Sequence, residues 1–113
     1  MAGDFDARDS AISLGRQILA TYRVMETGQG AQLVAKLMFD EVRTEICQLS
    51  AEQRKQVYDQ FQNLDVQAKF VRTIGAGTTN GFALDTAPDG RGNTDILLKH
   101  QDSIDLTLPI RCR

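Results

Sequence analysis

A glycine-rich segment in the second half of the chain is the first candidate for chemistry. Residues 75–81 (Gly-Ala-Gly-Thr-Thr-Asn-Gly) follow an apolar stretch that ends at Ile74. A strand that runs into a glycine-rich turn is how dinucleotide-binding sites begin. Here the spacing is G-x-G-x-x-x-G, no phosphate-loop lysine follows, and Pro88 leaves no room for the helix that such a site needs. The segment therefore predicts a connector, and a small enzyme with a glycine-rich ligand loop is the second alternative function.

Residues 89–95 (Asp-Gly-Arg-Gly-Asn-Thr-Asp) are the second candidate, because their oxygen-bearing side chains alternate as in a calcium loop. Arg91 occupies a ligand position of that loop, and its twelfth residue is His100 instead of a bidentate glutamate. The same residue types are typical of any solvated turn. The sequence predicts a turn here and no metal.

His100 is the only histidine, and it lies close to Asp102 and Ser103 in the sequence. A catalytic triad brings three groups together from separate positions, whereas these three fall in one expected turn. Cys47, in the middle of an expected helix, is typical of a small buried apolar residue. One histidine and the distant Cys47 and Cys112 do not supply the usual ligands of a zinc site. We therefore expect no catalytic residue, no cofactor and no metal.

Glu41 and Glu45 are one helical turn apart, with Asp40 beside them. Paired carboxylates can transfer protons or hold a metal, but no Glu-x-x-His motif accompanies them. The pattern is typical of a solvated helix face. Arg111 and Arg113 near the end of the sequence could contact a carboxylate or phosphate, and are also typical of solubilising residues.

The charge balance argues against a nucleic-acid-binding protein. Thirteen basic and 15 acidic residues give a net charge of −2. Binding to a phosphate backbone needs clustered positive charge, so this composition disfavours a nucleic-acid partner. The alternative function is a nucleic-acid-binding regulator that uses Arg8, Arg16 and Arg23 of the first helix. A helix-turn-helix around residues 27–30 is disfavoured because the helix after it is acidic.

The cysteine content and the start of the sequence predict a location. Two cysteines, and a first segment without the basic and apolar regions of a signal peptide, do not indicate a secreted disulfide framework. No apolar stretch approaches the roughly 20 residues that span a bilayer. We expect a cytoplasmic protein with reduced thiols and no membrane association.

Helical periodicity dominates the first 74 residues. Apolar residues at i, i+3, i+4 and i+7 predict helices from about Asp4 or Ser10 to Met25 and over about 31–49. Ser50 and Gln53 form a capping-box pattern that starts a third helix. Its expected seam alternates spacings of four and three, and the residues of this seam are Val57, Phe61, Leu64, Ala68 and Val71. Asn63 and Asp65 are weak helix formers and could split this helix near Leu64.

The periodicity changes to two at the end of the chain. Residues 95–100 and 104–111 predict two strands joined by a turn at 101–103, and Phe82-Ala83-Leu84 is either a short strand or an anchor. In the last strand Ile104, Leu106, Leu108, Ile110 and Cys112 are expected on one face, with Asp105, Thr107, Pro109 and Arg111 facing away. Pro109 cannot donate a ladder hydrogen bond, so this strand should lie at a sheet edge.

Together these patterns predict one domain over residues 1–113 of the α+β class, mainly α. It consists of a three-helix up-down bundle (1–74), a connector (75–93) and a C-terminal β-hairpin or extended arm (94–113). Such a protein is expected to be a non-enzymatic regulator, inhibitor or assembly factor that binds a protein partner or itself. The expected binding surfaces are the edge strand and apolar helix surface. Their residues are Ile104, Leu106, Leu108 and Ile110, and Phe39, Tyr58, Phe70 and Phe82.

Overall fold

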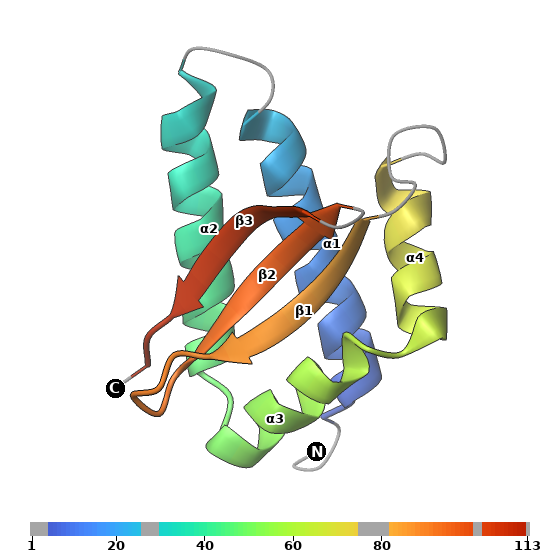
Figure 1. The fold of residues 1–113 in the computed structure, drawn as a ribbon, viewed down its shortest axis with the longest axis vertical. Helices are drawn as coiled ribbons and strands as arrows, with labels where there is room; N and C mark the ends of the chain where they lie inside the picture. Colours follow the sequence, from blue (N-terminus) through green and yellow to red (C-terminus); the bar gives the residue numbers. More distant parts are fainter. Residues whose placement is uncertain (1–4, 26–29, 75–81, 101–102, 113) are drawn as a thin grey trace.

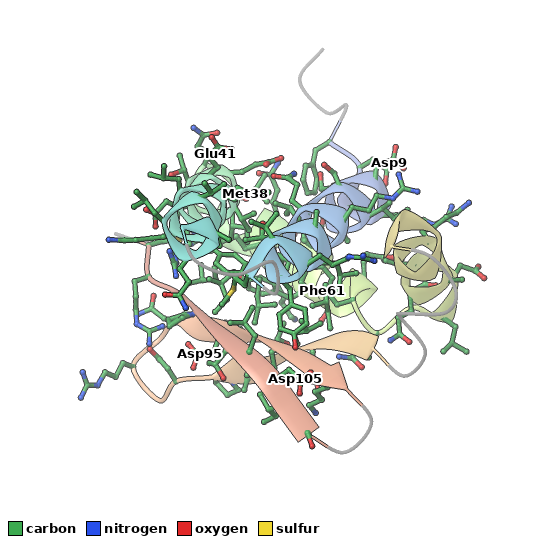
Figure 2. The ribbon with its side chains drawn as sticks, turned by 90° about the horizontal axis from the view of Figure 1, so that it is seen from above. Asp9, Met38, Glu41, Phe61, Asp95 and Asp105 are labelled. Atoms are coloured by element: carbon green, nitrogen blue, oxygen red, sulfur yellow. A yellow bond between two sulfur atoms is a disulfide. The ribbon has the colours of Figure 1, made fainter. Side chains whose placement is uncertain are left out.

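The computed structural model describes residues 5–25, 30–74, 82–100 and 103–112. Its elements are the helices α1 (Ala7–Met25), α2 (Ala31–Cys47), α3 (Ala51–Gln60) and α4 (Leu64–Ile74), followed by the strands β1 (Phe82–Pro88), β2 (Thr94–His100) and β3 (Ser103–Ile110). The strands form an antiparallel sheet across one side of the helices (Figures 1 and 2). The predicted α+β class, mainly α, is confirmed, and the C-terminal arm is a three-stranded sheet.

The predicted third helix is divided into α3 and α4. The capping box at its start is confirmed, since the Gln53 amide donates to Ser50 Oγ (3.1 Å) and the Ser50 amide donates to Gln53 Oε1 (3.0 Å). Asn63 then starts α4, where its Oδ1 accepts from the Asp65 amide (2.9 Å). Asn63 therefore divides the helix, as its low helix propensity suggested, and the structure adds that its side chain caps the start of α4.

This division changes which residues face the core. Val57 and Phe61 of the expected seam are buried, but Leu64 is 79% exposed. Ala68 is exposed as well, and Val66 is buried in their place. The seam prediction is wrong beyond Phe61, because α4 begins a new helix with its own rotation. The side chains of Phe70 and Val71 lie outside the described part.

The sheet has the order β1-β2-β3, so residues 82–84 belong to a third strand and β3 is an edge strand, as Pro109 predicted. Leu98 pairs with Leu106 while the next residue, Lys99, pairs with Ile104. Asp105 is the extra residue of this β-bulge in β3.

The bulge overturns part of the predicted alternation on β3. Ile104 lies opposite Lys99 and is 56% exposed, while the Asp105 carboxylate accepts from the Tyr22 hydroxyl of α1 (3.1 Å). One extra residue shifts the side-chain period of two, so Ile104 no longer shares a face with Leu106.

The core lies between the helices and the sheet, where Figure 2 shows Phe61. α1 contacts α2, α3 and α4 and so forms the centre of the helical layer. The core residues come from every helix with described side chains and from all three strands. The buried residues of this core cluster are Ala11, Leu14, Ile18, Leu19, Phe39, Val42, Ile46, Val57, Phe61, Val66, Leu84, Ile96, Leu98, Leu108 and Ile110.

Cys47 and Cys112 form a disulfide, so the expectation of reduced thiols is wrong. The pair joins the last residue of α2 to the chain just beyond β3, across 65 residues of sequence. Sequence spacing alone does not show that these two ends lie side by side. Cytosolic disulfides are rare because the thiol pool keeps cysteines reduced. The cytoplasmic location therefore stays a prediction, and the disulfide weighs against it.

Candidate docking surface

Helix α2 has a buried side that fixes its orientation. Ala35, Phe39, Val42 and Ile46 are spaced four, three and four residues apart, and all four are buried. This spacing places them on one stripe of the helix. The stripe determines which side of α2 is turned outward.

The outward side of α2 carries large aliphatic residues that the protein does not bury. Leu33 is 67% exposed, Val34 49% and Leu37 58%. Leu33 and Leu37 are one turn apart, and Val34 and Leu37 are three residues apart, so the three side chains are neighbours on the helix surface. In the described part of the chain, the other exposed large hydrophobic residues are single ones on two further elements, Leu64 of α4 and Ile104 of β3.

Acidic residues lie on the same outward side of α2, nearer its C-terminal end. Figure 2 shows Glu41 on the side of α2 turned away from the sheet. Asp40 pairs with Arg43 (2.6 Å), and Glu45 accepts from Gln17 Nε2 (3.3 Å). No residue that the structure describes forms an ion pair with Glu41.

These acidic residues line an open depression of about 610 Å³ on this side of α2. The residues that line it are Leu37, Asp40, Glu41, Thr44, Glu45 and Gln48. We call the combined surface the α2 outer face. It consists of the aliphatic residues Leu33, Val34 and Leu37 and the residues that line the depression.

The opposite flank of α2 is fastened to the edge of the sheet. Arg43 Nε donates to the Pro109 carbonyl oxygen (3.0 Å), and the disulfide follows one turn later. Pro109 has no N–H to offer, and its carbonyl is already taken. The C-terminal part of the β3 edge is therefore occupied by the protein itself.

The predicted apolar row of β3 packs mainly against the protein's own helices. Leu108 and Ile110 are buried and Leu106 is half-buried, while Ile104 is exposed. These residues thus do not form one exposed strip on the edge strand. A role for them in partner binding stays a prediction.

The aromatic residues expected on the helix surface are distributed differently. Phe39 is in the core, so the expectation that it lies on the surface is wrong. Tyr58 is half-buried, and its burial raises the pKa of its hydroxyl, an effect that the nearby Arg54 opposes. The side chains of Phe70 and Phe82 are outside the described part. The exposed aliphatic residues Leu33, Val34 and Leu37 are the feature that sequence analysis missed.

The segment 89–95 forms a turn held by an arginine. Arg111 Nη1 lies 3.4 Å from Asp89 Oδ2 and 3.0 Å from Asp95 Oδ1. Asp89 Oδ1 accepts from the Arg91 and Asn93 amides, and the hydrogen bond from the Arg91 amide is the largest cause of the lowered pKa of Asp89. The guanidinium thus supplies the positive charge between these carboxylates.

No group of three His, Cys, Asp or Glu residues within the described ranges is placed to hold a metal ion. The glycine-rich residues 75–81 and the side chain of His100 lie outside those ranges. Arg8, Arg16 and Arg23 are exposed on α1, and their use in nucleic-acid binding stays a prediction.

Comparison with known proteins gives no relative: no family model, no curated protein and no solved structure matches the chain. In the part that the structure describes, no helix has the length and apolar character needed to cross a membrane.

Proposed function

We propose that the protein is a non-enzymatic interaction protein that binds a protein partner through the α2 outer face. The observation that carries this proposal is the cluster of Leu33, Val34 and Leu37, exposed by 49–67% on a helix whose opposite side is fully packed. Contiguous exposed apolar residues bordered by polar ones are typical of interaction sites, whereas single exposed ones are ordinary. Leu64 and Ile104 belong to the second kind.

The hollows formed by the described residues favour a binding protein, because two of them are small and the third, the depression of about 610 Å³ on the α2 outer face, is open to solvent. The groove between α2 and β3 has a volume of about 230 Å³, and the cavity between α3 and the β1–β2 turn about 150 Å³. Small-molecule sites usually have roughly 300–1,000 Å³. The α2 outer face is open and extended instead, which suits a macromolecular partner.

Position-specific crosslinking tests the proposal. A photoreactive amino acid replaces Val34 in the full-length protein, which is then irradiated in extract of its source cells. We expect one defined adduct, and we expect Leu37→Asp to remove it, because a charge in the patch opposes apolar docking.

The matched control places the same photoreactive amino acid at Leu64, which is 79% exposed but lies on α4. Equal adducts from positions 34 and 64, or an adduct that Leu37→Asp leaves unchanged, would contradict docking on the α2 outer face. An adduct of twice the chain mass would identify a second copy of this protein as the occupant.

A further inference from the structure

We infer that the partner segment on the α2 outer face is an amphipathic helix of another protein that carries Lys or Arg beside its apolar stripe. The inference rests on the proposed function and adds the chemistry of the partner. Three features support it. Along α2, apolar residues are followed by acidic ones; the C-terminal end of the helix dipole is negative; and the backbone groups within the helix are hydrogen-bonded to each other.

The α2 outer face is divided along its length. Leu33, Val34 and Leu37 occupy its N-terminal half, and Asp40, Glu41 and Glu45 occupy its C-terminal half. At a rise of about 1.5 Å per residue, Leu33 and Glu45 are roughly 18 Å apart. A partner segment of similar length thus meets apolar residues at one end and carboxylates at the other.

The helix dipole adds to the negative charge at the second end. The C-terminus of a helix carries a partial negative charge, which basic residues in the last turn usually offset. The last turn of α2 contains Glu45 and no basic residue. This arrangement is unfavourable in the protein alone and becomes favourable when a cation from a partner lies there.

A second copy of the chain does not fit this face. In an antiparallel pair of α2 helices, Glu41 and Glu45 of one copy would lie over Leu33 and Val34 of the other, and burying unpaired carboxylates is costly. In a parallel pair, carboxylates would face carboxylates, and like charges repel. The face is therefore complementary to a different sequence.

Anionic surfaces are excluded by the same charges. Nucleic acids and anionic lipid headgroups attract clustered Lys and Arg, whereas the polar half of this face is acidic. A partner that carries Lys or Arg would instead pair with Glu41, which has no ion-pair partner in the described part of the chain.

The hydrogen-bonded backbone of α2 favours a helical partner over an extended strand. Backbone groups within a helix are hydrogen-bonded to each other, so strand addition has no free edge to use there. Contact must come from side chains, and an apolar stripe at helical spacing is matched by another helix laid alongside it.

Two designed peptides test the inference on the full-length, disulfide-bonded protein. The first is a helical peptide of about 18 residues, or five turns, with leucine on one stripe and lysine beside it. The second has glutamine in place of every lysine. Fluorescence anisotropy measures the Kd of each peptide at low and at high salt.

We expect the lysine peptide to bind about tenfold more tightly than the glutamine peptide, which is the gain expected from two exposed ion pairs. High salt should remove most of this difference, because exposed charges are screened. Glu41→Lys with Glu45→Lys should abolish it too. Since Glu45→Lys places a cation at the C-terminal end of α2, this variant is not expected to fail by unfolding.

The matched control is Glu52→Lys with Asp59→Lys on α3, where both residues are exposed. It changes the net charge of the protein equally and should alter the Kd of the lysine peptide less than about twofold, because α3 does not line the depression of the α2 outer face and salt screens exposed charges. Equal loss of binding in the two charge variants would mean attraction to net charge alone and would overturn the inference.

The remaining outcomes separate the inference from the proposed function. If both peptides bind equally and Leu37→Asp abolishes binding, the α2 outer face is a docking site but its partner is not basic. If neither peptide binds, or if Leu37→Asp has no effect, the α2 outer face is not the docking site and both proposals fail.

Discussion

The outward side of the sheet and the α2 outer face differ in how their charges are used. On the sheet, Lys99 Nζ lies 2.8 Å from Asp85 Oδ2, and Arg111 bridges Asp89 and Asp95. On α2, the aliphatic cluster is bordered by Glu41, for which the described part of the chain offers no ion pair.

This difference indicates which surface is complete in the isolated chain. Charged side chains that pair across strands protect a sheet from unwanted association. The outward side of the sheet therefore satisfies its own charges. The α2 outer face leaves its apolar residues and the Glu41 carboxylate for a partner, since Asp40 pairs with Arg43 and Glu45 accepts from Gln17. This is why we place docking there and not on the sheet.

Replacing a leucine by aspartate in β3 and on the α2 outer face should give the largest difference in the free energy of unfolding. Leu108→Asp places a carboxylate at a position of β3 that is 2% exposed, so it should lower the free energy of unfolding by about 3–5 kcal/mol or prevent folding. Leu37→Asp on α2 should change it by less than about 0.5 kcal/mol, because Leu37 is largely exposed. Urea unfolding of both variants measures the difference.

A large loss of stability in Leu37→Asp would break the comparison, because it would show that Leu37 is packed in the native protein. Leu37→Ser serves as the control for the charge itself, since Asp at this position also approaches Asp40 and Glu41. We expect Leu37→Ser to be as stable as the wild type.

The disulfide connects the two regions, and its loss should have the next largest effect. Closing a loop across 65 residues removes conformational entropy from the unfolded chain, and the chain-entropy estimate for this length is about 4 kcal/mol. Cys47→Ser with Cys112→Ser should therefore unfold at lower urea concentration than the oxidised wild type. The wild type in excess dithiol reductant should match the double variant, and no difference from the oxidised protein would argue against the disulfide.

The sequence allowed the class of the fold to be predicted because its signals are local. The change from helical to strand periodicity near residue 75, the capping box at Ser50 and the edge position of the strand with Pro109 all depend on near neighbours in the chain. Each of these predictions is confirmed.

The errors come from features that depend on distant parts of the chain. The pairing of Cys47 with Cys112 requires α2 and β3 to end side by side, and the bulge at Asp105 is accompanied by a contact with Tyr22 of α1. Composition and spacing contain neither fact.

The docking surface was missed for a related reason. The apolar positions of α2 cover more than one stripe, so the sequence did not show which of them face inward. Phe39 is expected on the surface from the sequence, whereas the packing of α2 against β3 and α1 buries it and leaves Leu37 exposed. Glu41 and Glu45 were correctly expected on a solvated side. That they share this side with Leu33 and Val34 depends on how α2 is rotated about its own axis, which the sequence does not show.

The smallest effect concerns the carboxylates of the two regions. The hydrogen bond from Lys99 is the largest cause of the lowered pKa of Asp85, and burial opposes it. Because the folded state holds the pKa of Asp85 below its ordinary value of 3.8, this carboxylate stabilises the fold above that pH. The contribution disappears as the pH falls through the folded pKa.

Asp85→Asn should therefore lower the free energy of unfolding at neutral pH by about 0.5–1 kcal/mol, a value reduced by solvent because both partners are about one third exposed. The variant should also lose less stability than the wild type below pH 3.8. Glu41→Gln on the α2 outer face should change stability at neutral pH by less than about 0.5 kcal/mol, because Glu41 forms no ion pair with any described residue. Urea unfolding at neutral and acidic pH checks all three proteins. If Glu41→Gln were the more damaging change, the Glu41 carboxylate would stabilise this fold, and it would not be free for a partner.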